Sequence, residues 1–118
     1  MRMNYLKFLQ TLKKDLNQSN SDFKTVKFFR KDIVSVSVWL CVLEQYYINN
    51  INNIENIIRE IPREYASRPT IFKIIDDAVA KNYFEKIADK NDKRKYNLIP
   101  TSQTIKEFEE WSKVFKGF

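Results

Sequence analysis

Apolar residues recur at helical spacing along most of the chain, in stretches separated by short polar breaks. In the first stretch they lie four, three and four residues apart, a pattern typical of a seam shared by two helices. These positions are Tyr5, Leu9, Leu12 and Leu16. After a polar break over 19–22, a second pattern predicts a short helix that ends near residue 30. Its apolar positions are Phe23, Val26 and Phe29.

The stretch IVSVSVWLCVLEQYYI is compatible with two structures. Its first half alternates valine with serine, as a half-buried strand does. Its second half follows helical spacing instead, at Trp39, Val42 and Tyr46. We predict a helix that begins at about Val36, with Ser35 as its candidate N-cap.

Two further helices are predicted in close succession. In NNIENIIREIP, Asn52 and Glu55 have the spacing of a capping box, and Pro62 ends the apolar stripe. After a polar turn, Ser67 is the candidate N-cap of a helix over 67–81. The two helices and the turn between them form a candidate helix-turn-helix.

YFEKIA and KYNLIP predict two short strands, which makes the basic stretch between them the tip of a β-hairpin. A last helical stripe follows, and Thr101 or Ser102 is its candidate N-cap. The positions of this stripe are Ile105, Phe108, Trp111 and Phe115.

This order of elements predicts a mainly α (α+β) fold. It is a winged helix-turn-helix with a two-stranded β wing and with N- and C-terminal dimerisation helices. We expect one domain over 1–118. Its parts are an N-terminal dimerisation segment (1–31), the winged helix-turn-helix (33–101) and a C-terminal helix (102–118).

Composition narrows the chemistry. The 118 residues include no histidine and one cysteine, Cys41, which excludes histidine-based catalysis and Cys/His metal sites within one chain. Neighbouring acids such as Asp76 and Asp77 do not share a helix face, so we predict no enzyme, metal or cofactor. No apolar run is long enough to span a membrane and no signal peptide is evident, so we expect a cytoplasmic protein without a membrane partner. Cys41 lies in an apolar run and is expected to act as a small hydrophobe.

A net charge of +6 suggests an anionic partner, and the predicted fold favours double-stranded DNA. Helix 67–81 would enter the major groove. There Arg68 could pair with guanine, Thr70 could bond a base or a phosphate, and Phe72 could touch a thymine methyl. The wing, 88–96, would lie on the backbone or in the minor groove. The predicted DNA-binding residues are Arg68, Pro69, Thr70, Phe72, Lys73, Lys90, Lys93, Arg94 and Lys95.

The second half of the chain resembles the multiple-antibiotic-resistance regulator (MarR) family of winged-helix transcription factors. The resemblance lies in SRPTIFKIIDDAVAKNYFEK followed by DKRKYNLIPT, and the length and the "RPT" start are similar to the short staphylococcal accessory regulator (SarA) subgroup. It implies that Asp92 braces the wing residue Arg94. Asn82 replaces the family's usual glycine, Pro100 replaces an apolar strand residue, and the 62–66 turn is longer.

The resemblance also implies a cleft for a small aromatic effector, with Trp39, Tyr46 and Tyr47 as candidates. Because a single recognition helix, such as the one predicted over 67–81, rarely binds DNA tightly without a second half-site, we predict a homodimer. Its expected contacts are Tyr5, Leu9, Leu12, Leu16, Phe108, Trp111 and Phe115. The first four could equally pack within one chain.

Two other functions stay open at this point. A winged helix can be a protein-interaction module, such as an antirepressor or an assembly subunit, and Phe72 at the border of a polar face favours that alternative. The chain could also be a nonspecific architectural DNA binder. Residues 1–31 carry eight basic and two acidic groups, whereas residues 68–95 carry eight and five, so the strongest positive charge lies outside the reader helix. A basic hairpin tip is also often only a solvated turn.

Overall fold

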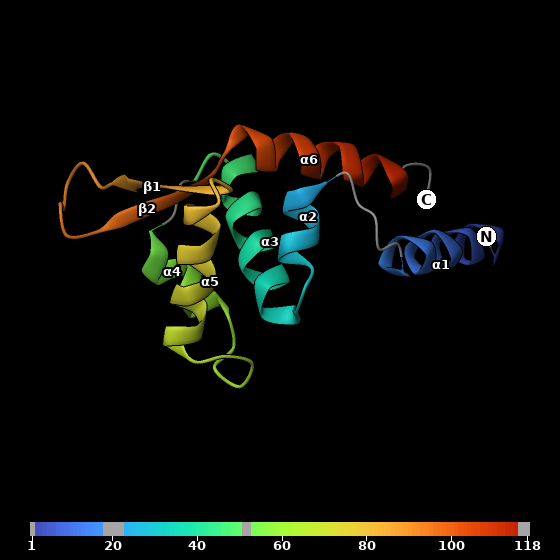
Figure 1. Cartoon of the computed structure of the whole chain (residues 1–118), viewed down its shortest axis with the longest axis horizontal. Helices are drawn as coiled ribbons and strands as arrows, with labels where there is room; N and C mark the ends of the chain where they lie inside the picture. Colours follow the sequence, from blue (N-terminus) through green and yellow to red (C-terminus); the bar gives the residue numbers. More distant parts are fainter. Residues whose placement is uncertain (1, 18–22, 51–52, 116–118) are drawn as a thin grey trace.

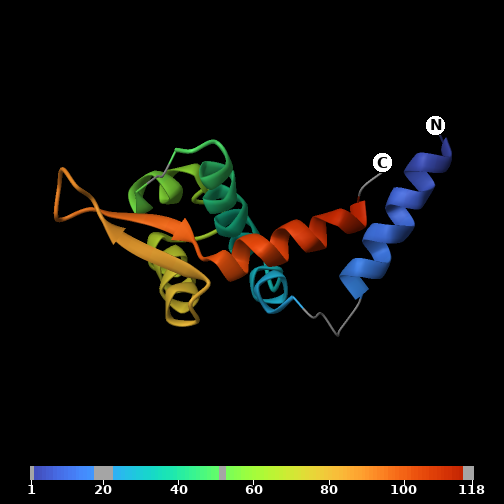
Figure 2. The same cartoon turned by 90° about the horizontal axis from the view of Figure 1, so that it is seen from above.

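The structure, a computed structural model, describes residues 2–17, 23–50 and 53–115. Helix α3 lies between α2 and α5, and α6 crosses one end of them (Figure 1). The wing and α1 project from opposite ends of a molecule that measures 52 × 29 × 28 Å (Figures 1 and 2). The elements in chain order are α1 (Arg2–Asn17), α2 (Lys24–Phe29), α3 (Ile33–Tyr47), α4 (Ile54–Glu60), α5 (Arg68–Ala80), β1 (Phe84–Ala88), β2 (Tyr96–Pro100), α6 (Ser102–Ser112) and the 3-10 helix η1 (Lys113–Phe115).

The start of α3 differs from the prediction. The helix begins at Ile33, and its N-cap is Asp32, whose carboxylate accepts a hydrogen bond from the Ser35 amide at 2.8 Å. Ser35 therefore lies inside the helix, fully buried. The valine–serine alternation was misleading because Ser35 is buried on the helix together with Val34, so the serines do not mark an exposed strand face. Val34 and Val38, one helical turn apart, are both buried in the core.

The caps of the next two helices were largely predictable. The Asn53 side chain accepts from the Asn56 amide at 2.9 Å and caps α4. The predicted capping-box residue, Asn52, lies outside the described residues. Ser67 caps α5 as predicted, and Pro69 occupies the first turn, where no amide donor is needed.

The hairpin forms where it was predicted. Strands β1 and β2 pair antiparallel, from Phe84 opposite Pro100 to Ala88 opposite Tyr96. Asn82 precedes the hairpin with φ of 63°, the left-handed conformation expected at the end of α5. A single bridge between Asn53 and Asn97 also joins the start of α4 to β2. The wing is therefore tied directly to the helix-turn-helix.

The core is mainly aliphatic, with the buried aromatic rings of Phe29, Trp39 and Phe84 packed within it. Phe29 stacks between Trp39 and Phe84, with centroid separations of 5.9 and 4.9 Å. At the base of the hairpin, the hydroxyls of Thr101 and Thr104 both donate to the Tyr83 carbonyl, at 3.1 and 2.6 Å. These contacts join α2, α3, the hairpin and α6 in one body. The chain thus has a winged helix-turn-helix fold, with one helix before it and one after it.

Helix α1 joins this body at its C-terminal end. The Asp15 carboxylate accepts a hydrogen bond from Arg30 Nη1 at 2.5 Å and from Trp111 Nε1 at 3.1 Å. Asp15 and Arg30 are both largely buried as a pair. The other end of α1 extends away from α2–α5 (Figure 2). We call this contact between Asp15, Arg30 and Trp111 the arm junction.

Candidate nucleic-acid interface

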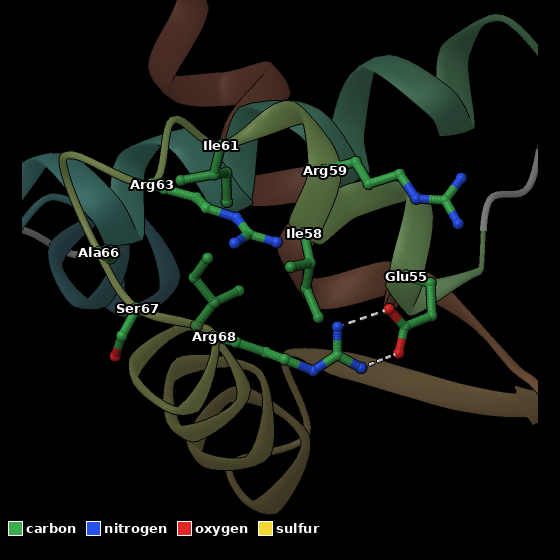
Figure 3. Close-up of a pocket in the computed structure, with 9 residues that line it drawn as sticks. Glu55, Ile58, Arg59, Ile61, Arg63, Ala66, Ser67 and Arg68 are labelled. Carbon is green, nitrogen blue, oxygen red and sulfur yellow. Dashed lines mark hydrogen bonds and ion pairs between the residues drawn. The ribbon is translucent and has the colours of Figure 1, made fainter.

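The first residue of α5, Arg68, is held by two neighbours. Its Nη1 donates to Glu55 Oε2 at 2.8 Å, and its Nη2 pairs with Glu55 Oε1 (Figure 3). The guanidinium carbon also lies 5.2 Å from the centre of the Phe72 ring, within the range of a cation–π contact. The hydrogen bond from Arg68 lowers the pKa of Glu55, and the same bond raises the pKa of Arg68. Both groups are therefore charged at neutral pH.

The remaining predicted residues of α5 follow the helical wheel. Pro69, Thr70 and Lys73 are exposed, whereas Phe72 is half-buried at the border. The opposite face packs into the core through Ile71, Ile74, Ile75 and Ala78. The helix thus has a buried side that fixes its position and a polar side that is open to solvent.

One acidic residue of α5, Asp76, has a basic partner on the hairpin. Asp76, on the exposed side of α5, forms an ion pair with Lys86 of β1, in which Lys86 Nζ lies 3.1 Å from Asp76 Oδ1. This contact ties α5 to the hairpin. It also offsets one of the negative charges that would oppose a phosphate backbone.

The wing tip is exposed and basic. Lys90, Lys93, Arg94 and Lys95 are all exposed, and the Arg94 side chain retains 93% of its accessible surface. Asp92 Oδ1 accepts from the Arg94 amide at 3.0 Å and lies 3.4 Å from Arg94 Nε. Asp89 accepts in the same way from the Asn91 amide at 2.8 Å. The two aspartates therefore shape the turn that presents the four cations.

A cavity of about 700 Å³ lies between α4, the 61–67 turn and the start of α5. Its lining includes the basic residues Arg59, Arg63 and Arg68 and the apolar residues Ile58 and Ile71. In Figure 3, Arg63 points into the space between the two helices, and Arg59 points outward from α4. Arg59 and Arg63 are not among the residues predicted from the sequence. They lie at the end of a helix and in a turn whose only noted property was its length.

A smaller cavity, of about 140 Å³, lies on the wing side of the Arg68–Glu55 pair. It is lined by Asn53, Ile54, Glu55, Phe72, Arg94, Lys95 and Tyr96. Among the described residues that line either cavity, Glu55 is the one acid, against five basic side chains. A basic surface therefore runs from the turn, past Arg68, to the wing. We call it the reader surface.

The predicted effector residues lie in different environments. Trp39 is 1% exposed and packs edge-on against Phe108, at 5.5 Å between centroids. Tyr46 and Tyr47 lie at the surface, where the Tyr47 hydroxyl donates to Glu109 at 2.6 Å. The effector site stays a prediction.

The predicted dimer residues fall into two groups. Tyr5, Leu9 and Leu16 on α1 are 70%, 60% and 60% exposed, and Leu12 is half-buried. At the other end of the chain, aromatic residues contact one another and α1. Trp111 packs against Phe115 at 5.2 Å, and Phe115 lies 6.0 Å from Phe8. Dimerisation through either group stays a prediction.

Cys41 is half-buried, and its environment disfavours ionisation of the thiol. Burial raises the pKa of the thiol to about 12, aided by a hydrogen bond to Glu60 and by the charges of Glu60 and Glu44. A raised thiol pKa favours the protonated form, so the nucleophilic thiolate is scarce at neutral pH.

We expect alkylation of Cys41 by iodoacetamide at pH 8 to be about a thousandfold slower in the folded protein than in urea, because the thiol pKa is higher. The rate should rise about tenfold per pH unit towards pH 12 while the fold persists. The loss of free thiol, followed by mass spectrometry, measures both rates. Equal rates at pH 8 would show that the thiol is not shielded.

No protein-family model and no curated protein sequence matches the chain. Among solved structures, the chain is similar to an uncharacterized SlyA-like transcription regulator from Listeria monocytogenes. The TM-score is 0.47 and the identity 18%, over 98% of this chain and 70% of the other. None of the described helices is long and apolar enough to cross a membrane. The winged helix-turn-helix is established by the chain's own elements: two helices joined by a turn, an antiparallel hairpin after them, and a shared core.

Proposed function

We propose that the protein is a transcriptional regulator that binds double-stranded DNA as a homodimer and reads sequence with α5 in the major groove. The observation that carries the proposal is the reader surface. It places five basic side chains around two cavities that contain one acid, beside a helix whose outer face is open. Positive charge on this scale releases counterions from phosphates and strengthens binding.

The parts of the reader surface would have different tasks. Arg68 and Thr70, in the first turn of α5, are placed for base edges because the N-terminal end of a reader helix enters the groove first. Arg59 and Arg63 flank that turn and would contact phosphates. The wing would contact the neighbouring backbone or minor groove. Phosphate contacts fix the position of the protein on the duplex, and base contacts confer sequence preference.

The proposal of a homodimer is supported by α1. Three large apolar side chains on one helix are mostly exposed, at positions that repeat at seam spacing. The helix extends away from the core and is attached at the arm junction, so this face is not covered by the described part of its own chain (Figures 1 and 2). A second copy of α1 has the matching pattern. A symmetric pair would bury both faces and present two reader helices to two half-sites.

Selection of duplexes from a random pool at physiological ionic strength tests the proposal. We expect enrichment of an inverted repeat with half-sites about one helical turn apart. Retention of all duplexes without enrichment, lost on adding salt, would indicate an architectural binder. No retention even at low salt would favour a protein-binding module.

The wing makes a separate prediction. Replacing Lys93 and Arg94 together by alanine should weaken binding to every duplex by a similar factor, because the contacts are to phosphates. The slope of log affinity against log salt should fall by up to about 2 per protomer. Fluorescence anisotropy over a salt series measures the slope. Alanine at Lys106 of α6 and Lys113 of η1 removes the same charge elsewhere and is the matched control; an equal effect there would assign the change to net charge.

A further inference from the structure

Glu55 occupies an unexpected place. It is the one acid among the described residues that line the two cavities of the reader surface, and it contacts the arginine at the tip of the reader helix. An acid at that point should oppose the approach of DNA, because it repels phosphates. We therefore expect its contacts to provide a benefit to DNA recognition that offsets this repulsion of phosphates.

The geometry of the pair indicates what that role is. A guanidinium carries five N–H donors in one plane. The Glu55 carboxylate takes one donor from each terminal nitrogen of Arg68, end-on. One side edge, formed by Nε–H and the outer hydrogen of a terminal nitrogen, still offers two parallel donors. This is the arrangement that matches O6 and N7 of guanine.

Phe72 restricts the same guanidinium from a second direction. Its ring lies 5.2 Å below the guanidinium carbon, and the ring itself is half-buried on α5. The end-on contact with Glu55 and the cation–π contact with Phe72 together restrict the direction of the Arg68 side chain. The arginine nevertheless remains half exposed to solvent, so a base edge can reach it.

We infer that Glu55 is a positioning residue for sequence recognition, which holds Arg68 in the orientation that reads guanine and keeps it from binding backbone phosphate. The inference rests on the proposed function. A guanidinium that is already paired with a carboxylate is a weak ligand for phosphate, because its charge is largely offset. Its free edge still donates two directed hydrogen bonds. Glu55 thus lowers affinity for arbitrary duplexes and raises the preference for the correct one.

The test compares Glu55→Gln with wild-type protein on two duplexes, the selected operator and the same duplex with its guanine contacts changed. Glutamine has the same shape but lacks the charge and the second carboxylate oxygen. We expect affinity for the changed duplex to rise and affinity for the operator to stay level or fall. The ratio of the two affinities should drop about tenfold or more, the size of one bidentate base contact.

Glu64→Gln is the matched control, because Glu64 is an exposed acid of the neighbouring 61–67 turn that does not line the cavity. A merely electrostatic role for Glu55 would raise both affinities equally in both variants and leave the ratio unchanged, which would overturn the inference. In an Arg68→Ala background, Glu55→Gln should leave the ratio unaltered, because there is no arginine to position. A drop in the ratio that persists there would also overturn it.

The failure of the proposed function is distinguishable from the failure of the inference. Wild-type protein that shows no preference among duplexes removes the proposed function and the inference with it. A clear wild-type preference that Glu55→Gln leaves intact removes only the inference. Thermal unfolding of each variant checks the fold, and little change is expected because exposed ion pairs contribute little to stability.

Discussion

Replacing Arg68 by alanine should abolish most of the sequence preference while leaving a substantial part of the affinity. The side chain is the one arginine in the first turn of α5, and its free edge has the geometry for guanine. A bidentate base contact contributes about 1–3 kcal/mol of discrimination, and a dimer makes it twice. The ratio of operator to random-duplex affinity should therefore fall by about two orders of magnitude, measured by competition binding.

Lys73→Ala is the matched control for Arg68→Ala. Lys73 lies on the same exposed face, further along α5, and is placed for a phosphate. Its loss should weaken operator and random duplex by the same factor. An equal loss on all duplexes for Arg68→Ala would show that Arg68 also contacts only the backbone.

Replacing Leu9 by aspartate should dissociate the dimer. Leu9 is mostly exposed on α1 and lies in the middle of its apolar pattern. In a symmetric pair each copy contributes one such leucine, and burying a leucine contributes about 1.5–3 kcal/mol. The loss of two leucines and the cost of burying two carboxylates should raise the dimer dissociation constant more than a hundredfold. Sedimentation equilibrium measures it, and affinity for the full operator should fall towards that of a single half-site.

Gln10→Asp provides the control for the dimer, because Gln10 is exposed on α1 one residue away from the apolar stripe. It introduces the same charge and the same change in helix propensity. Its dimer should be nearly unaffected. A wild-type protein that sediments as a monomer at all concentrations would contradict dimerisation through α1.

Much of the fold was predictable because local signals agreed with one another. Ser67 followed by an apolar stripe gave the start of α5, Asn82 gave its left-handed end, and the two short apolar runs gave the hairpin. Each of these signals acts over a few residues. The start of α3 was misplaced because Asp32, not Ser35, caps the helix, and alternating valine and serine suit a strand and a buried helix equally well.

The candidate site was only partly predictable, since its key contacts join residues far apart in the sequence. The sequence predicted that Arg68 contacts a base. Its pairing with Glu55 was not predictable, because it depends on how α4 packs against α5. Arg59 and Arg63 became part of the site only when the turn was seen to bring them beside Arg68. The contact of Phe72 with a thymine methyl stays a prediction, and the position of its ring 5.2 Å from the Arg68 guanidinium carbon was not predictable from the sequence.

The arm junction has a consequence for operators. Asp15 connects the last turn of α1 to both α2 and α6, through Arg30 and Trp111. If two arms join at their apolar faces, this connection would set the distance and the angle between the two copies of α5. The position of α1 would then determine the separation between the two half-sites that the dimer prefers, and α5 would determine the base sequence of each half-site. Substitutions at the junction should change which half-site separation is preferred without changing the half-site itself.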